Sequence, residues 1–325
     1  MGTAIGFGEL AAERLRRETD LDRIASLLNW GPVSYRLEKH CRKDEGRPPF
    51  PPLTMFRALL LAQWYGLSDR GLEEALCDRL SFRRFIELSI EEATPDHTTL
   101  WRFRERLQQA GLERKLLAII NAQLEAKGLM VKCGTLIDAT VVETAAARPD
   151  PTSGSTDRVD PDAAFLKREG QPGSAYGYKA HIAVDQGSLL VREAKLTPAN
   201  IGETTVADEL IVATSDACAV YADRAYASKA RRQLLSELGL QDGIMHRASK
   251  HYPLPPELRD HNVAASKVRR SVETVFAVLK RVYGFRRTRY FGLIRNQLQL
   301  TLLAICFNLR RALVLSNHAR TASPA

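Results

Sequence analysis

Three carboxylates stand where side chains from different structural elements could meet. Asp138 closes the apolar run 134–138, Asp223 closes the apolar run 217–223, and Glu273 lies between Arg269 and Lys280 in a stretch with helical periodicity. Ionised carboxylates are hard oxygen ligands of the kind that Mg²⁺ and Mn²⁺ prefer. Two such ions about 3.5–4 Å apart can activate the attacking oxygen of a phosphodiester reaction and stabilise the leaving oxygen. Metal-dependent phosphodiester chemistry is therefore one interpretation of these acids.

The stretch 266–283 predicts one amphipathic helix that carries Glu273. At about 100° per residue, one apolar stripe collects Val268, Val272, Val275, Phe276, Leu279 and Val282. On the same helical wheel Arg269, Glu273 and Lys280 fall within an arc of about 40° beside that stripe. This would present one acid flanked by two cations. The simpler alternative is a surface Arg–Glu pair at i,i+4, which is a common helix stabiliser.

The two aspartates are expected at strand ends. In open α/β sheets, functional groups collect in the crevice outside the carboxyl ends of the strands, so Asp138, Asp223 and a helix acid could converge there. An aspartate after a strand is also often only a cap or turn residue. Either one alone could therefore be structural.

The residues around these acids resemble the DDE transposases of bacterial insertion sequences, in the IS-five-like group. The matching segments are Ile137-Asp138-Ala139-Thr140, Tyr221-Ala222-Asp223-Arg224-Ala225-Tyr226, residues 177–185 and Pro95-Asp96-His97-Thr98-Thr99-Leu100. The family's third-acid motif reads Tyr, two residues, Arg, three residues, Glu, six residues, Lys. Arg269, Glu273 and Lys280 keep that spacing, whereas Ser266 stands at the tyrosine position. The resemblance extends from about residue 52 to residue 311.

This resemblance implies an α/β fold, an RNase H-like mixed sheet flanked by helices. The sequence suits that order: a strand at 136–142, a hairpin of 178–184 with 190–196, a helix near 203–212, the Asp223 strand, a helix at 229–238, a strand near 243–245 and the Glu273 helix. We expect an N-terminal helical domain at 1–130 and a catalytic domain at 131–325. A polar loop at about 147–175, which contains Asp157, Asp160 and Asp162, is expected to be flexible.

The family's activity implies a role for each site residue. Asp138, Asp223 and Glu273 would be catalytic and would hold two Mg²⁺ or Mn²⁺ ions, with Asp138 bridging both, while Arg269 and Lys280 would hold phosphates. Water would free a 3′-hydroxyl at a transposon end, bound through its terminal inverted repeat, and that hydroxyl would attack target DNA. Two alternatives stay open, a metal-dependent RNase H-like nuclease and a non-catalytic DNA-binding regulator derived from a transposase. Lys179 and His181 share a strand face that points either toward the site or to the surface.

The charge distribution indicates a polyanionic partner. The formal net charge is +9, yet residues 243–325 alone carry 15 Lys and Arg against 3 acids. A basic C-terminal stretch joined to a mildly acidic remainder favours double-stranded DNA as the partner. Arg286, Arg287 and Arg289 follow the Glu273 helix and are candidate phosphate-binding residues. The alternative is a solvated basic face that aids solubility.

The N-terminal half reads as helical. Helices are expected at about 52–65, after Ser68 with Leu72, Leu76 and Leu80 in register, at 98–109 after Asp96, and on to Lys127. Arg102, Arg104 and Arg106 are expected to project from the third of these, with Trp101 and Leu107 facing inward. Such a helix resembles the second helix of a helix-turn-helix, with Arg102 and Arg106 contacting DNA. An ordinary helical bundle is the alternative.

The sequence also gives expectations about the protein's location in the cell and its oligomeric state. No apolar run approaches the roughly 20 residues of a membrane span, and 302–307 reads as a buried helix. The N-terminus lacks an apolar signal core. We expect a bacterial cytoplasmic, nucleoid-associated protein that works as a homodimer or higher oligomer on DNA, without a membrane partner.

Overall fold

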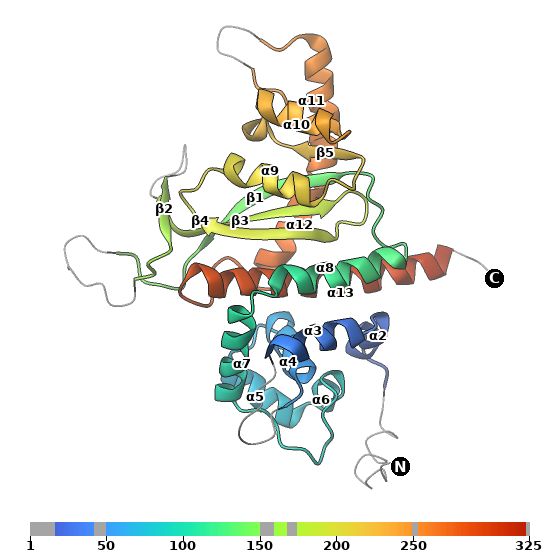
Figure 1. The fold of residues 1–325 in the computed structure, drawn as a ribbon, viewed down its shortest axis with the longest axis vertical. Coiled ribbons are helices and arrows are strands. Elements are labelled where there is room, and N and C mark those ends of the chain that lie inside the picture. Colours follow the sequence, from blue (N-terminus) through green and yellow to red (C-terminus); the bar gives the residue numbers. More distant parts are fainter. Residues whose placement is uncertain (1–16, 42–49, 150–158, 168–173, 249–252, 323–325) are drawn as a thin grey trace.

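The computed structural model describes residues 17–41, 50–149, 159–167, 174–248 and 253–322. The molecule is elongated, with the N-terminal helices at one end and a mixed sheet beyond them (Figure 1). Two long helices, α8 (Glu113–Ala126) and α13 (Leu293–Ala322), lie between these two parts. Asp157 lies outside the described residues.

The sheet contains the strands that the sequence predicted, in the predicted order along the chain, and one further strand, β2. Its strands are β1 (Thr135–Glu143), β2 (Ala164–Lys167), β3 (Ser174–Asp185), β4 (Val191–Pro198), β5 (Ala219–Ala222) and β6 (Gln241–Ile244). The main order is β4–β3–β1–β5–β6, with β2 pairing on the far part of β3. Strand β1 runs antiparallel to β3 and parallel to β5. This antiparallel hairpin joined to parallel strands is RNase H-like, so the expected fold class is confirmed.

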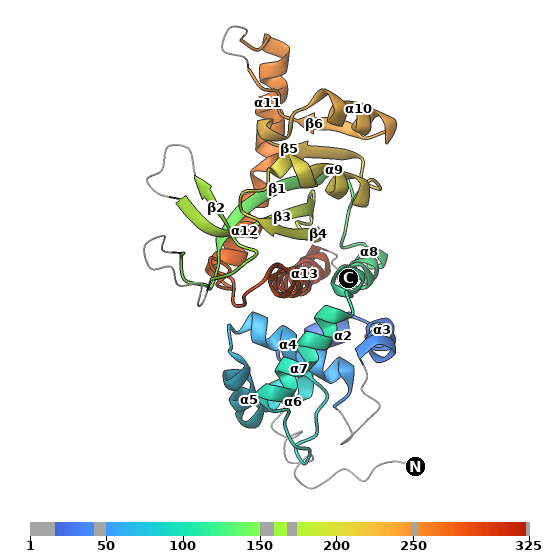
Figure 2. The same ribbon diagram turned by 60° about the vertical axis from the view of Figure 1, so that its left-hand side comes forward.

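Helices cover both faces of the sheet (Figures 1 and 2). On one face α9 (Glu203–Ala213) and α10 (Lys229–Glu237) pack with Ile137 and Val220 in a small apolar cluster. On the other face lie α12 (Ser271–Arg281), α13 and α8, whose core includes Leu136 and Val142 of β1. Successive β1 residues therefore pack into the cores on opposite faces of the sheet, as the two-residue period of a strand requires.

Helix α13 is the central helix of this second core. Its segment Leu293–His318 is long and apolar enough to cross a membrane, but 72% of its apolar window is buried inside the protein. The Trp64 indole donates a hydrogen bond to the Cys306 carbonyl, which ties α13 to an N-terminal helix. Residues 302–307 are all buried, so the expected buried helix is confirmed.

The N-terminal part is all-helical. Its elements are α2 (Asp20–Leu27), α3 (Gly31–Cys41), α4 (Pro52–Trp64), α5 (Asp69–Asp78), α6 (Leu80–Phe85) and α7 (His97–Gln109). The expected caps are present, because Ser68 and Asp96 accept backbone hydrogen bonds at the starts of α5 and α7. The prediction for Leu80 is wrong: α5 ends earlier, and Leu80 begins α6 with 42% exposure. One continuous core joins α4, α8 and α13, so a domain boundary near residue 130 stays a proposal.

The stretch expected as a loop at 147–175 contains ordered structure. It includes β2 and a buried carboxylate, Asp160, which accepts hydrogen bonds from the hydroxyls of Thr144 and Tyr178. The Gly292 amide donates to the same side chain and so fixes the start of α13. Residues 159–167 therefore include a strand and a buried, hydrogen-bonded aspartate where the polar composition predicted only a loop.

The Glu273 helix is two helices rather than one. Helix α11 (Pro256–Arg269) ends just before α12 begins, and the Glu273 amide donates to the Arg270 carbonyl, three residues back. This switch from the i−4 pattern breaks the helix at Arg270. Helix α11 buries only Ala265 and projects away from the body (Figures 1 and 2). Val282 is 58% exposed and leaves the expected apolar stripe, because α12 ends at Arg281.

Candidate active site

Asp138 and Asp223 lie on neighbouring strands. Strand β1 covers the predicted strand at 136–142 and runs on to Glu143, so Asp138 lies within the strand rather than at its end. The parallel register pairs Leu136 with Tyr221, and two further steps along both chains align Asp138 with Asp223. Aligned residues of parallel strands place their side chains on the same face. Pairing between β1 and β5 stops just before this level, where the chain leaves β5.

Asp223 follows β5, as the sequence suggested. Its carboxylate accepts a hydrogen bond of 2.7 Å from the Ala225 amide and caps the short 3₁₀ helix η1 (Arg224–Tyr226). The capping interpretation is therefore correct as well, and it does not compete with a role at the site. One carboxylate oxygen is used by the cap, which orients the side chain at the strand end.

Arg269 connects the first aspartate with Glu273. Its guanidinium lies 3.2 Å from an Asp138 oxygen and 3.4 Å from a Glu273 oxygen. The bridge spans the helix break, since Arg269 ends α11 and Glu273 lies in the first turn of α12. Glu273 is otherwise open, with 61% of its side chain exposed. The surface Arg–Glu pair anticipated from the i,i+4 spacing is present, and its arginine also forms an ion pair with the partly buried Asp138.

The pKa of Asp138 is raised from its usual range to about 6. Burial is the largest cause, and the negative charges of Asp223 and Glu203 raise the pKa further. The Ala139 amide, which donates to Asp138 at 2.9 Å, and the Arg269 guanidinium lower it. The net shift of the Asp138 pKa is upward because burial and the neighbouring negative charges outweigh these two interactions.

The sequence interpretation missed Glu203 and Tyr226. Glu203 begins α9, and its carboxylate interacts electrostatically with Asp223 and Asp138. The Tyr226 side chain is 1% exposed, and its hydroxyl lies in the field of Glu203, Asp138 and Asp223. Nothing in the spacing distinguished Glu203 from the other acids of its helix. Tyr226 was part of a matching segment but received no role.

Lys179 and His181 point inward, so the surface interpretation of that strand face is wrong. The Lys179 amine donates to the Ile201 carbonyl at 2.9 Å and pairs with Glu203 at 3.7 Å. The His181 ring contacts the Thr197 hydroxyl at 2.9 Å. Burial lowers the pKa of His181 to about 4, so this ring is neutral at physiological pH. Lys179 borders the acids, whereas His181 serves packing under α9.

The donor chemistry fits a hard divalent cation, although the side chains do not converge on one point. Among the described residues, no three His, Cys, Asp or Glu side chains form a group arranged to hold a metal ion. The Arg269 guanidinium stands between Asp138 and Glu273 and supplies the positive charge there. The raised pKa of Asp138 and the carboxylate oxygens at the site suit Mg²⁺ or Mn²⁺.

A basic groove begins at Glu273. The groove encloses about 490 Å³, and its lining includes Glu273, Lys280, Arg281, Arg286 and Arg287. The backbone at Arg286 and Thr288 hydrogen-bonds with Glu143, so the segment carrying the two arginines lies along the end of β1. Both arginines are exposed. The groove thus joins the candidate acids to positive charge on the surface.

Lys280 both lines the groove and fixes its wall. Its amine donates to the Thr140 hydroxyl at 2.5 Å and to the Val141 carbonyl at 3.0 Å. These bonds tie α12 to β1 two residues beyond Asp138. Phosphate binding by Lys280 stays a proposal. Its amine would have to contact the phosphate in addition to Thr140 and Val141.

The contacts of Arg289 argue against its predicted phosphate binding. Its guanidinium donates to the carbonyls of Ala62 and Leu67, at 3.4 Å and 2.9 Å. These carbonyls lie at and just beyond the end of α4, where backbone acceptors lack helical partners. Arg289 is therefore a structural residue that ties the basic segment to the N-terminal helices.

Helix α7 presents fewer arginines than expected. Arg104 is 200° of helical rotation from Arg102 and is buried, where it forms a bidentate ion pair with Asp69 at 2.7 Å. Arg106 is half-buried, and its guanidinium packs near the Phe103 ring. Trp101, expected inside, is 48% exposed. Only Arg102 of the three arginines projects freely, so the helix-turn-helix interpretation rests on a smaller basic face.

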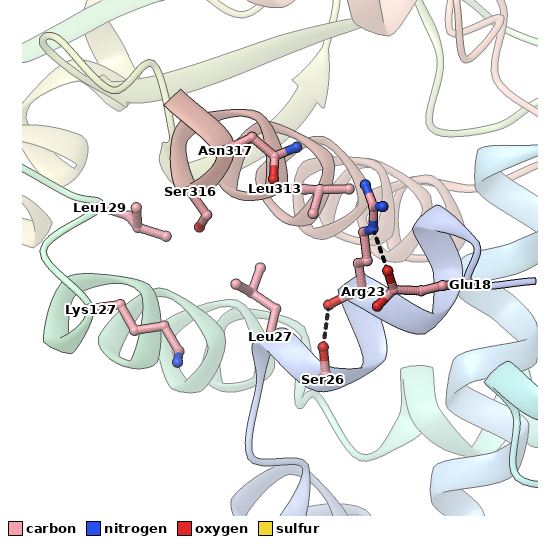
Figure 3. A pocket seen from close by; sticks show the side chains of 9 residues that line it. All are labelled: Glu18, Arg23, Ser26, Leu27, Lys127, Leu129, Leu313, Ser316 and Asn317. Atoms are coloured by element: carbon pink, nitrogen blue, oxygen red, sulfur yellow. Dashed lines mark hydrogen bonds and ion pairs between the residues drawn. The ribbon is translucent and has the colours of Figure 1, made fainter. Parts of the chain in front are cut away.

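A second cavity lies away from the acids. Figure 3 shows it between α2, the end of α8 and the C-terminal part of α13. It encloses about 510 Å³ and is lined by Glu18, Arg23, Ser26, Leu27, Lys127, Leu129, Leu313, Ser316 and Asn317. None of these elements carries a candidate acid, so this cavity has no part in the chemistry proposed below.

Comparison with known families identifies the family to which the chain belongs. Residues 130–309 match the family described as Transposase DDE domain, and residues 9–106 match the family described as Transposase domain (DUF772). The chain belongs to the DDE transposases. The first match contains all three candidate acids and spans more than half of the sequence. The recognised resemblance is confirmed, and this transposase is a DNA-processing enzyme by family.

One solved structure of similar fold is the cryo-EM structure of the piggyBac transposase synaptic complex with hairpin DNA. The TM-score is 0.51 at 12% sequence identity, covering 96% of this chain and 78% of that one. At this identity the similarity concerns the fold alone. It confirms that the mixed sheet and the helical N-terminal part together form an arrangement known among transposases.

The raised pKa of Asp138 predicts how the metal-free transposase responds to pH. Ionisation of Asp138 is less favourable in the folded state than in the unfolded state, where the carboxyl keeps a pKa near 3.9. The unfolded state thus binds fewer protons between about pH 4 and 6, so this group lowers stability as pH rises through that window. Asp138→Asn should raise the free energy of unfolding at pH 7.5 by about 1–3 kcal/mol, and much less at pH 4.

Urea denaturation with a chelator present, at both pH values, measures this difference. Glu143→Gln, at the exposed end of the same strand, is the matched control and should change stability little. An Asp138→Asn protein less stable than the wild type at pH 7.5 would show that the Arg269 ion pair outweighs the cost of burying the charge.

Proposed function

We propose that this transposase cuts DNA at the ends of its own bacterial insertion sequence and joins the freed 3′-hydroxyls to target DNA. Two Mg²⁺ or Mn²⁺ ions would be held by Asp138, Asp223 and Glu273. The observation that carries the proposal is one connected arrangement: aspartates on neighbouring strands, an arginine that ties the first to Glu273, and a basic groove that starts at that glutamate.

When bound, the two ions would activate the attacking oxygen and stabilise the leaving oxygen of the phosphodiester. In the free protein Arg269 forms ion pairs with both Asp138 and Glu273. If metal ions bound Asp138 and Glu273, the Arg269 guanidinium would be released from these ion pairs. It could then hold a phosphate through two hydrogen bonds. The same side chain would thus keep the acids together before DNA arrives and orient the scissile strand afterwards.

The groove would carry the DNA backbone away from the reacting phosphate. Arg281, Arg286 and Arg287 line it, and among the described residues no acid forms an ion pair with them that would neutralise their charge. Lys280 contacts the strand of Asp138. Phosphate contacts of this kind position DNA without reading its sequence. The groove therefore accounts for holding DNA, while recognition of the terminal inverted repeats must come from elsewhere.

The N-terminal helices are the proposed source of that recognition. Arg102 and Trp101 are exposed side by side on α7. Arg102→Ala should lower affinity for a duplex of the element's end by about tenfold, corresponding to loss of about 1.4 kcal/mol from one charged contact. Lys115→Ala on α8, also exposed, is the control and should bind normally. Unchanged affinity in a fluorescence titration of the Arg102 variant would leave α7 as a packing helix.

Assembly and location complete the proposal. The similar piggyBac structure is a synaptic complex with hairpin DNA, which supports double-stranded DNA as the partner here and assembly on DNA ends as a homodimer or larger oligomer. A bacterial transposase of this kind would work in the cytoplasm, in association with the nucleoid.

Strand transfer is the deciding experiment. The purified protein would be incubated with Mg²⁺, a supercoiled target plasmid and a labelled duplex that ends in the inverted repeat flanking the gene. Joining of labelled 3′ ends to the plasmid supports the proposal. Cleavage without joining would instead identify a nuclease, and binding without either reaction would identify a non-catalytic regulator. A duplex with a scrambled terminal repeat is the control for end recognition.

A further inference from the structure

We propose that Glu203 is a fourth carboxylate of the metal site, on the side of Asp223, and that the Tyr226 hydroxyl donates a hydrogen bond to oxygen bound there. This inference rests on the proposed function, because it concerns the same divalent ions. It adds two residues on the opposite side of the site from Glu273.

Glu203 occupies a defined place at the edge of the acid cluster. It begins α9, which packs on the face of the sheet opposite α13, whereas Glu273 lies on the α13 side (Figures 1 and 2). Its carboxylate interacts with Asp223, and its charge reaches Asp138. Asp138 and Asp223 therefore have a helix-borne acid on each side of the sheet.

Lys179 fixes the position of Glu203. The Lys179 side chain is only 7% exposed, and its amine is held by the Ile201 carbonyl while it pairs with Glu203. The Glu203 side chain keeps 30% exposure, so its oxygens face an accessible space rather than the core. An acid held by a buried lysine at the border of two aspartates is oriented before any ligand binds.

Tyr226 gives the independent evidence that a ligand belongs between these acids. Its side chain is 1% exposed, yet its hydroxyl has no hydrogen-bond partner among the described residues. Buried polar groups in native proteins are nearly always paired, so an unpaired hydroxyl requires an explanation. The three charges acting most strongly on this hydroxyl are those of Glu203, Asp138 and Asp223. A bound oxygen, such as a water molecule on an ion or a phosphate oxygen, would satisfy it.

The test measures Mn²⁺ binding to the full-length protein without DNA, by electron paramagnetic resonance and calorimetry. Glu203→Gln should weaken Mn²⁺ binding at least about tenfold, since even loss of supporting groups around a metal has effects of about 10–100-fold. Glu209→Gln is the matched control on the same helix, where the side chain pairs with the distant Lys195 and Arg114. It should bind Mn²⁺ as the wild type does.

Tyr226→Phe provides a second measurement. Unlike Glu203→Gln, this substitution does not remove a charge. Because the hydroxyl is unpaired in the metal-free protein, its removal should leave the metal-free melting temperature unchanged or higher. The rise in melting temperature on adding Mn²⁺ should be smaller in this variant than in the wild type. A large drop in the metal-free melting temperature would show that the hydroxyl has a structural partner and would overturn its assigned role.

Asp223→Asn separates failure of this inference from failure of the proposed function. If Asp223→Asn loses Mn²⁺ but Glu203→Gln binds normally, the fourth carboxylate is overturned and the proposed metal site stands. If the wild type itself binds no Mn²⁺, the metal premise of the proposed function is overturned, and this inference falls with it. Weaker binding in both variants, with normal binding by Glu209→Gln, supports Glu203 as a ligand.

Discussion

Replacing Asp138, Asp223 or Glu273 by Ala is expected to reduce strand cleavage by at least about 10³-fold while DNA-end binding is kept. That loss corresponds to about 4 kcal/mol of transition-state stabilisation, within the several kcal/mol that bound metal ions supply. The three acids come from β1, the end of β5 and the first turn of α12. Each substitution therefore removes a different proposed metal ligand. The measurement is single-turnover cleavage of an end duplex, with binding followed separately by fluorescence anisotropy.

Glu273 gives the sharpest version of this prediction. Its side chain is 61% exposed and contacts Arg269, so its loss should cost the fold little. A large loss of cleavage in a Glu273→Ala protein that is fully stable and still binds the end duplex would therefore be catalytic. Glu237→Ala, an exposed acid at the end of α10, is the matched control. Cleavage by Glu273→Ala at more than about a tenth of the wild-type rate would remove Glu273 from the site.

Replacing Arg286 and Arg287 together by Ala is expected to weaken DNA binding about 30-fold at physiological salt. Each phosphate contact contributes about 0.9 to the slope of log affinity against log salt, so the slope should flatten by up to about 1.8 units. Base preference should change little, because phosphate contacts do not read sequence. Both arginines are exposed and line the groove beside Glu273, which is the physical reason for choosing them. Affinities measured at several salt concentrations give the slope.

Arg289→Ala is the control that the structure provides for this measurement. The guanidinium of this neighbouring arginine donates hydrogen bonds to the carbonyls of Ala62 and Leu67. Its loss should therefore lower the melting temperature and leave the salt slope of DNA binding unchanged. A flattened slope in Arg289→Ala, together with an unchanged slope in the double variant, would reverse the assignment of DNA-binding and structural arginines.

Much of the local structure was determined by the sequence alone. Alternation and turn residues marked the hairpin of β3 and β4, and Ser68 and Asp96 marked helix starts that the side chains do cap. These features depend on neighbours in the chain, so a local pattern is sufficient to specify them. The motif spacing around Glu273 likewise singled out Arg269 and Lys280, which both contact β1 in the folded protein.

Only the tertiary structure decided which charged side chains face the site and which are structural. Arg104 and Arg289 were indistinguishable in sequence from exposed arginines, but burial against Asp69 and against the end of α4 makes them structural. Glu203 resembled the other acids of its helix until packing of α9 on the sheet brought it near Asp223. These outcomes depend on contacts between residues far apart in the chain, which local periodicity cannot encode. The sequence thus determined the elements and the motif acids, whereas packing determined the electrostatic environment in which those acids work.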